Sequence, residues 1–398
     1  MRTPVILVAG QKYTDPIVGA LLRTPGTLVV EHRFDGQVVR RTMVTLQHGV
    51  LTTAEAGLEL AKGCVPCTIR NDLMVLLRKL HRRDDVDRIV VHLAPWLEPE
   101  PICWAINHVR VRVVPGYLDG PAGLDVSIAA VVTCIDSSVW LSQALGDARL
   151  NDGPTQAQAV VCQAEFADVA VLNHANPIVA AVLRRLAPRA RISVGADGIE
   201  HALDNLFRDA RRGESDDPFG PLLAGQPPLD SRGLVKLVEF NARRPFHPQR
   251  LHACLDVLLE GVIRTRGRLW LASQPEQAMW LESAGGGLQV SSAGKWLAAL
   301  TAPELADIDA ERRAFAELTW DERYGDRHTA MTVLVYSAHA AEILDALDGA
   351  LLTDDELRSP EDWIHYDDPF GDWHEAPCAA LAEDAEDTPA HHSQDGDR

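Results

Sequence analysis

Cys64 and Cys67 form a Cys-x-x-Cys pair directly before an amphipathic helical segment. Two thiols at this spacing can reach one soft cation, and a helix N-terminus favours the thiolate form that zinc binds. Two ligands do not complete a tetrahedral site, so His48, Cys103 or a partner chain would have to supply the others. We expect Cys64 and Cys67 to be metal ligands, with zinc as the ion. A thioredoxin-like redox pair and a purely structural pair are the alternatives.

The loop that follows the first short apolar run begins at Gly10 and invites comparison with a phosphate-binding loop. Such a loop needs glycines whose N–H groups surround the anion, a lysine, and a hydroxyl that holds Mg²⁺. Counting from Gly10, those three places are taken by Asp15, Pro16 and Ile17. Lys12 could replace the missing lysine, but no hydroxyl follows it at the required place. We therefore expect no competent triphosphate site.

Apolar runs and amphipathic helical segments alternate through about residue 207. The runs have the pattern of buried strands, and the helical segment 69–80 repeats apolar residues at close to 3.6 spacing. This alternation predicts an α/β domain over 1–207, with a parallel sheet covered by helices on both faces. Ligands of such domains bind in the loops that follow the strands. The expected strands are Pro4–Ala9, Thr27–His32, Arg88–Leu93, Ile128–Ile135 and Val169–Leu172.

Three further segments follow this domain. Residues 208–233 are polar and rich in turn-forming residues, which predicts a linker. Residues 234–353 combine expected strands and helices with four tryptophans, so we expect a smaller α+β domain with its own core. Residues 354–398 contain fifteen carboxylates against two arginines and form an acidic tail. The end of this tail, 379–398, has few large apolar residues and is expected to be disordered.

The order of these motifs resembles the CobW family of GTP-dependent metal chaperones. In the first domain the resemblance rests on the Gly10 loop, on the Cys-x-x-Cys-Thr-x-Arg-x-Asp-Leu motif and on residues 163–173. In the second domain it rests on residues 241–248, 267–272 and 320–327. It spans about residues 4–340. The resemblance implies a P-loop-NTPase-like domain with a mostly parallel sheet, followed by a CobW C-terminal domain.

The family's GTP-binding motifs are degenerate in this sequence. Its Glu-Thr-Thr-Gly-Leu-Ala-Asp-Pro segment falls on residues 92–99, where His92 replaces the glutamate and Pro95 the glycine. Its guanine-reading Asn-Lys-x-Asp ends in Asn176, whose amide cannot accept both guanine N–H groups as a carboxylate does. Leaving those donors unpaired costs about 1–3 kcal/mol. The family metal motif Cys-x-Cys-Cys has Pro66 in place of its middle cysteine. We therefore expect no catalytic and no nucleotide-binding residues, and GTP is not an expected cofactor.

The resemblance extends to a divergent branch of this family, the ribosome hibernation factor-recruiting factors. It implies a non-enzymatic adaptor that brings a hibernation-promoting factor to the ribosome under zinc limitation and so inhibits translation. The main alternative is a GTP-dependent zinc metallochaperone of the CobW family. A zinc-storage protein is a third possibility, for which only His391, His392 and the acidic tail offer additional ligands.

The charge balance limits the partners that this chain can bind. With 38 basic and 57 acidic residues the formal net charge is −19, which argues against broad binding to nucleic acid or to an anionic membrane. A local basic patch on or after one helix could still contact ribosomal RNA, although a solvated helix face beside Asp84 and Asp85 is the simpler interpretation. No signal peptide and no run of 18 apolar residues is found, so we expect a cytoplasmic protein. The patch consists of Arg70, Arg78, Lys79, Arg82 and Arg83.

Overall fold

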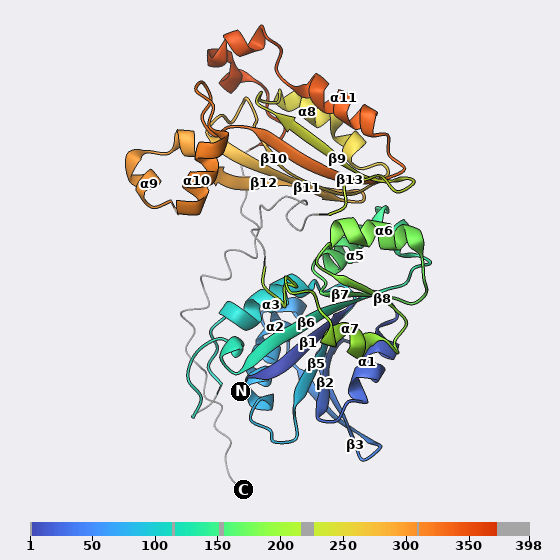
Figure 1. Cartoon of the computed structure of the whole chain (residues 1–398). Helices are drawn as coiled ribbons and strands as arrows, with labels where there is room; N and C mark the ends of the chain where they lie inside the picture. Colours follow the sequence, from blue (N-terminus) through green and yellow to red (C-terminus); the bar gives the residue numbers. More distant parts are fainter. Residues whose placement is uncertain (1, 114–115, 151–154, 216–226, 309, 372–398) are drawn as a thin grey trace.

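The computed structural model describes residues 2–113, 116–150, 155–215, 227–308 and 310–371, which form two β-sheets with flanking helices. The first sheet has eight strands in the order β4-β3-β2-β5-β1-β6-β7-β8, and the second has five in the order β12-β11-β10-β13-β9 (Figure 1). Strands β2, β5, β1, β6, β7 and β8 run parallel to one another, whereas β3 pairs antiparallel with both β2 and β4. The expected mostly parallel α/β domain is confirmed.

The first sheet is built from strands that alternate with helices along the chain. Its strands are β1 Thr3–Ala9, β2 Thr27–Phe34, β3 Val39–Gln47, β4 Val50–Leu58, β5 Arg88–His92, β6 Val126–Ile135, β7 Val169–Leu172 and β8 Arg191–Val194. The helices are α1 Thr14–Leu22, α2 Val65–Leu80, α3 Pro99–His108, α4 Trp140–Ala144, α5 Gln156–Glu165, α6 Pro177–Leu186 and α7 Ile199–Asp204, with a 3-10 turn at Ala122–Leu124. Within the described part of the chain, no helix combines the length and apolarity that a membrane span requires.

The second sheet is wholly antiparallel. Its elements are β9 Val235–Ala242, α8 Pro248–Cys254, β10 Val262–Leu269, β11 Gln277–Ala284, β12 Gly287–Lys295, α9 Ala302–Ala306, α10 Ala310–Thr319, β13 Thr329–Tyr336 and α11 Ala340–Ala350. Short 3-10 turns occupy Leu255–Leu258, Leu297–Ala299, Glu356–Arg358 and Pro360–His365. Three of the four tryptophans expected in this core are buried, namely Trp270, Trp280 and Trp296, whereas Trp320 is 51% exposed.

Helices cover both faces of the first sheet because its central strands are apolar on both sides. Val5 and Leu7 of β1 pack with Ile69 and Leu73 of α2 on one face. Ile6 of the same strand packs with α1 and α7 on the other face. The continuous apolar runs of the sequence arise from this two-sided burial. The apolar face of α2 packs on the sheet and so holds this helix in place.

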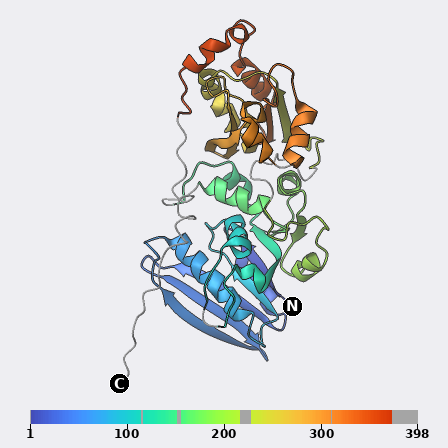
Figure 2. The same ribbon diagram turned by 90° about the vertical axis from the view of Figure 1, so that its left-hand side faces the viewer.

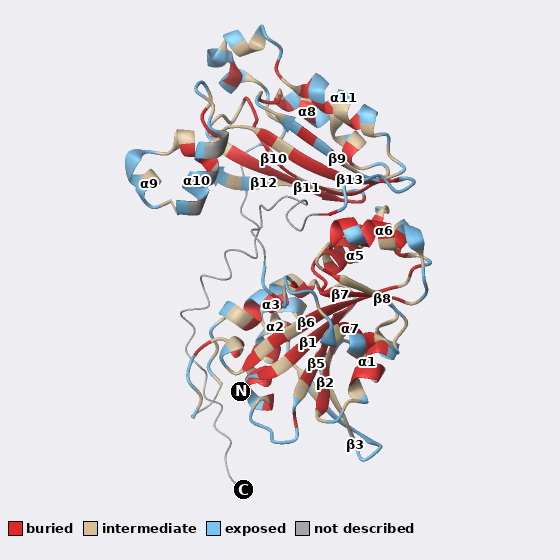
Figure 3. Cartoon of the chain, viewed as in Figure 1, coloured by how far each residue is buried: buried red, intermediate tan, exposed pale blue. Residues whose placement is uncertain are grey.

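The two domains share one apolar interface. Helices α5 and α6 lie against the second sheet in both views (Figures 1 and 2). One buried cluster joins Val160 and Val182 of these helices to Ile263 of β10 and Leu334 of β13. Figure 3 shows buried residues on α5 and α6 and along the strands of the second sheet above them. A displacement of α5 would therefore disturb its packing against the second sheet.

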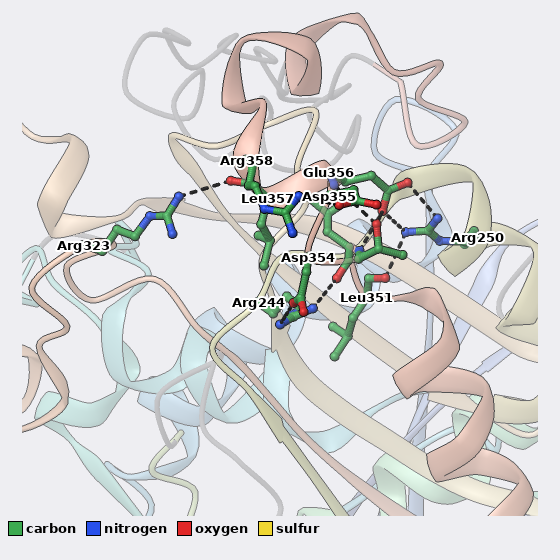
Figure 4. A network of polar contacts seen from close by, with 11 residues as sticks. Arg244, Arg250, Arg323, Leu351, Asp354, Asp355, Glu356, Leu357 and Arg358 are labelled. Carbon is green, nitrogen blue, oxygen red and sulfur yellow. Dashed lines mark hydrogen bonds and ion pairs between the residues drawn. The ribbon is translucent and has the colours of Figure 1, made fainter.

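The first part of the acidic tail folds onto the second domain. Arg250 forms hydrogen bonds with the Glu356 carboxylate and with the carbonyl of Leu351, and Arg244 pairs with Asp354 (Figure 4). The hydrogen bonds from Arg250 lower the pKa of Glu356 to about 2. Trp363 is buried in a small cluster with Trp270. The expected disorder of 379–398 concerns residues outside the described part of the chain.

Candidate metal and nucleotide site

The Cys-x-x-Cys pair lies at the first turn of α2. Cys64 is the residue that precedes the helix, and its Sγ accepts a hydrogen bond from the backbone N–H of Cys67 at 3.2 Å. The Thr68 hydroxyl donates to the Cys64 carbonyl and accepts from the N–H of Ala61, which closes the turn. Both cysteines are partly exposed. Two sulfur atoms therefore lie at a helix N-terminus, within reach of an incoming ion.

The other ligands considered from the sequence do not join this pair. His48 lies in the turn that precedes β4, whereas Cys64 follows the other end of this strand. The nine residues of β4 span roughly 27 Å, so His48 is too far away to share a metal ion with Cys64. Cys103 is fully buried in α3. Burial also raises the pKa of the Cys103, Cys134, Cys162 and Cys254 thiols, which disfavours the thiolate form. In the described ranges no group of three or more His, Cys, Asp or Glu side chains could hold a metal ion.

Asp72 anchors helix α2 to the sheet. Its carboxylate accepts from Arg41 Nη1 at 2.6 Å and lies 2.8 Å from His32 Nε2. Burial alone would raise the pKa of Asp72, but the hydrogen bonds from His32 and Arg41 outweigh burial and lower the pKa. Because β2 and β3 supply these two partners, the middle of α2 is held in a fixed position relative to the sheet.

We expect Asp72→Asn to reduce the free energy of unfolding by about 3 kcal/mol at pH 7, because it removes the carboxylate that pairs with the largely buried Arg41 guanidinium. The lowered pKa means that this stabilisation is present above the unfolded value of 3.8 and is lost as the pH falls through the folded value. Urea unfolding at pH 7 and again near pH 3 should show the difference between wild type and variant shrinking. Asp84→Asn, on an exposed residue, is the control and should change stability by less than about 0.5 kcal/mol. A loss below about 1 kcal/mol at pH 7 would contradict this role.

The loop after β1 does not fit a nucleoside triphosphate with Mg²⁺. Gly10 has a φ of 142°, and a Cβ there would meet the carbonyl of Cys134 at 2.6 Å, so this glycine is required for packing. Asp15 and Pro16 occupy the first turn of α1, where a phosphate would need N–H donors and positive charge. Ile17, at the place of the Mg²⁺-binding hydroxyl, is fully buried in the core.

Two glutamines occupy the space between this loop and the segment after β5. The Gln11 amide donates to the Pro95 carbonyl and lies 3.5 Å from Gln163 Oε1. The Gln163 amide donates to the carbonyls of Pro95 at 2.8 Å and Leu97 at 2.9 Å. A cavity lined by Lys12 and these glutamines measures about 10 Å³, which is about the space of one water molecule. We call this arrangement of Gln11, Gln163 and residues 95–97 the glutamine clamp.

Sequence reasoning missed the glutamine clamp. Gln163 opens one of the segments that resemble the family, but it is only 1% exposed, and its partners are more than sixty residues away. A polar amide within an apolar helical stretch was the available signal, since a buried amide must find hydrogen-bond partners.

The segment expected at the guanine-reading position is engaged within the protein. The Asn176 side chain accepts from the N–H groups of Ile178 and Val179 and caps α6, while its amide donates to the Ser137 carbonyl. Asn173 donates to Asp136 at 3.0 Å. Both amides therefore serve the local fold in the described arrangement.

Charged residues continue from the glutamine clamp to the domain interface. Glu165 follows Gln163 on α5 and contacts Arg264 and Arg266 of β10 at 3.1 and 3.0 Å. Arg264, 3% exposed, also pairs with Glu282. Burial raises the pKa of Glu98, next to the clamp, to about 7. At the end of β5, His92 pairs with Glu31 at 3.1 Å. Burial would raise the pKa of Glu31, but hydrogen bonds from His92 and Arg33 lower it.

The expected basic patch is only partly present at the surface. The prediction is wrong for Arg78, which is 2% exposed and pairs with Asp125 at 2.7 Å. The Arg82 guanidinium lies 3.5 Å from the ring centre of Tyr117, and Arg83 pairs with Asp85. Each of these three arginines therefore has a partner within the protein, either far away in the sequence or just after the helix.

Both domains match known protein families. Residues 29–193 match the CobW/HypB/UreG nucleotide-binding domain, and residues 235–351 match the cobalamin synthesis protein cobW C-terminal domain. The zinc chaperone Rv0106 of Mycobacterium tuberculosis is 64% identical over 391 residues, covering 98% of each chain. The zinc-regulated GTPase metalloprotein activator 1 of Dictyostelium discoideum is 25% identical over 86% of this chain and 74% of its own. Among solved structures, the crystal structure of Zn(II)-bound YjiA GTPase from E. coli matches with a TM-score of 0.34 and 14% sequence identity. The match covers 88% of this chain and 100% of the YjiA chain. The chain belongs to the CobW family.

Proposed function

We propose that this protein is a zinc chaperone, which binds Zn²⁺ as cargo at Cys64 and Cys67 and passes it to an acceptor. The observation that carries the proposal is the open character of the pair: two partly exposed thiols at a helix start, with no third ligand among the described residues. Four protein ligands hold a structural zinc ion in a closed site, whereas open positions accept ligands of another molecule. The name of the relative at 64% identity supports the same function.

The proposal includes zinc transfer without GTP hydrolysis by this chain. The glutamine clamp fills the space between the loop after β1 and the segment after β5, and Asp15 and Pro16 replace N–H donors and a cation. Some relatives are named GTPases, which makes nucleotide binding the point to measure.

The adaptor that recruits a hibernation-promoting factor to the ribosome is the second candidate. The glutamine clamp favours it, because a nucleotide domain closed by its own side chains acts through its surfaces. The names of the relatives support the chaperone better.

The deciding experiment loads the full chain with zinc and follows transfer to a chromophoric chelator, with and without GTP and Mg²⁺. We expect one zinc ion per chain, rapid transfer, the same rate with GTP, and no phosphate release. Absence of zinc binding by folded protein would sink the chaperone, and phosphate release would sink the GTP-independent form. Co-sedimentation with ribosomes and hibernation-promoting factor, in chelator and in added zinc, tests the adaptor: recruitment in chelator alone would favour it.

A further inference from the structure

Strand β4 forms an exposed edge of the first sheet. It pairs with β3 over nine consecutive residues without a bulge, from Gln47 opposite Val50 to Val39 opposite Leu58. Within the strand order of the described residues, β4 has no neighbour on its other side. Nearly all of its residues are exposed, and Val50 and Leu51 are 64% and 63% exposed. The hairpin runs along the rim of the first domain, where β3 is labelled in Figure 3.

The other edge strands of the described sheets carry features that prevent pairing, whereas β4 does not. Strand β8 has only four residues, β12 ends at Lys295 and pairs irregularly with β11, and β9 exposes Lys236 and Glu239. Short length, charges and bulges are the usual protection of an edge. In β4 the single charged residue is Glu55, whose carboxylate lies 3.6 Å from Arg40. The strand has neither lysine nor proline.

The hairpin turn determines which backbone groups β4 presents. His48 and Gly49 have φ values of 52° and 79°, the conformation of a two-residue type I′ turn. In such a hairpin the residues flanking the turn exchange both hydrogen bonds, and hydrogen-bonded pairs then alternate along the ladder. The N–H and C=O groups that point away from β3 therefore belong to Leu51, Thr53, Glu55 and Gly57.

We propose that β4 pairs antiparallel with β4 of a second copy of this chain, across a two-fold axis at Ala54. In this register the exposed Val50 faces the half-buried Leu58 of the second copy, so two apolar side chains meet. Thr53 faces Glu55, so no like charges are opposed. Such an interface is isologous and closes as a dimer.

The outward backbone groups fit this register. Thr53 and Glu55 exchange hydrogen bonds across the axis, as do Leu51 and Gly57, giving roughly eight main-chain hydrogen bonds. Ala54 then forms a non-hydrogen-bonded pair with its own copy, where side chains approach most closely and a small residue fits. One strand pair buries less than the roughly 800 Å² per partner of a standard interface, so we expect a dimer that dissociates in the micromolar range.

Sedimentation equilibrium of the full chain over a concentration series tests the dimer. Ala54→Lys places two lysines face to face at the axis and should raise the dissociation constant at least about fivefold. Thr45→Lys is the matched control: it lies on the same face of β3, opposite Thr52, away from the edge, and should leave the constant unchanged. Circular dichroism confirms that each variant is folded. A chain that stays monomeric throughout, or a dimer indifferent to Ala54→Lys, overturns the proposal.

Cysteine cross-linking tests the register. Under mild oxidation with diamide, Ala54→Cys should give a disulfide-linked dimer, because the two thiols meet at the axis. Thr52→Cys, on the same face, is opposed by Ala56 and should cross-link no more than wild type, which reports the background of the native thiols. Equal cross-linking of the two variants means that the strands do not pair about Ala54. If instead the chain pairs only with a foreign protein, both solution tests fail and the self-pairing proposal is wrong.

Discussion

Arg264→Met is expected to reduce the free energy of unfolding by about 3 kcal/mol, because it removes the more deeply buried of the two arginines that pair with Glu165 and Glu282 and leaves these carboxylates to the partly exposed Arg266. Arg264 is 3% exposed and bridges Glu165 of the first domain to Glu282 of the second. Methionine retains much of the apolar volume of the arginine stem, so the loss reports mainly the missing ion pairs of Arg264. Urea unfolding followed by tryptophan fluorescence at pH 7.5 is the measurement.

The same variant should separate the unfolding of the two domains. In the wild type, the apolar cluster that joins α5 and α6 to the second sheet favours one transition. In Arg264→Met we expect two transitions, since the interface loses its charge balance. Glu165→Gln in this background removes a buried carboxylate that has lost one of its two arginines and should restore part of the lost stability. Arg112→Met, at an arginine 91% exposed, is the control for a surface ion pair and should cost less than about 1 kcal/mol.

The pH dependence gives the interface prediction a second readout. The folded pKa of Glu98 is about 7, raised from 4.5 mainly by burial. A raised carboxyl pKa favours the folded state below the unfolded value, and this contribution is lost as the pH rises from about 4.5 through 7. Removal of the Arg264 cation takes away a group that favours the charged form, so the variant should lose more stability at pH 8 than at pH 5.5. An equal loss at both values, or a loss below about 1 kcal/mol, would contradict the network.

The elements that the sequence predicts well are those with a single physical signature. Strands β1, β2, β5, β6 and β7 coincide with the expected apolar runs because parallel strands are buried on both faces. The β3–β4 hairpin escaped prediction because β4 is mostly exposed and β3 mostly half-buried, so the two strands show neither a continuous apolar run nor strict alternation.

The candidate site likewise has features that the sequence predicts and features that it does not. The replacements at Asp15 and Pro16 can be interpreted from chemistry alone, because each removes a group that a phosphate needs. The glutamine clamp could not be predicted, since Gln11 and Gln163 are 152 residues apart and amides have many possible partners. The burial of Arg78 was hidden for the same reason, because Asp125 lies 47 residues away.

Through helix α5, the glutamine clamp is connected to the charged residues of the domain interface. Gln163 and Glu165 lie two residues apart on α5, the first bound to the segment after β5 and the second to the arginines of β10. Side chains of the protein thus fix the loops that a nucleotide would otherwise order. The proposed function therefore predicts that zinc binding at α2 needs no nucleotide.

The double substitution Cys64→Ser and Cys67→Ser is expected to weaken zinc binding at least about 100-fold, because a neutral hydroxyl replaces each thiolate ligand. Wild-type affinity should fall as the pH is lowered, since protons compete with zinc for both sulfurs. Competition with a chromophoric chelator measures both effects. Cys254→Ser, at another partly exposed thiol, should leave the affinity unchanged. Unaltered zinc affinity in the double variant would remove the pair as ligands.

The same variant separates a ligand role from a structural one. At position 64 a serine hydroxyl can accept the N–H of Cys67 as the sulfur does, and serine is a preferred residue before a helix. Helix α2 should therefore begin at the same residue, and the unfolding free energy without metal should change by less than about 1 kcal/mol. Zinc should stabilise the wild type and not the variant, because only binding to the folded state raises stability. A variant that is unstable without metal would mean that the two cysteines serve packing, since loss of a cargo site leaves the metal-free protein as stable as before.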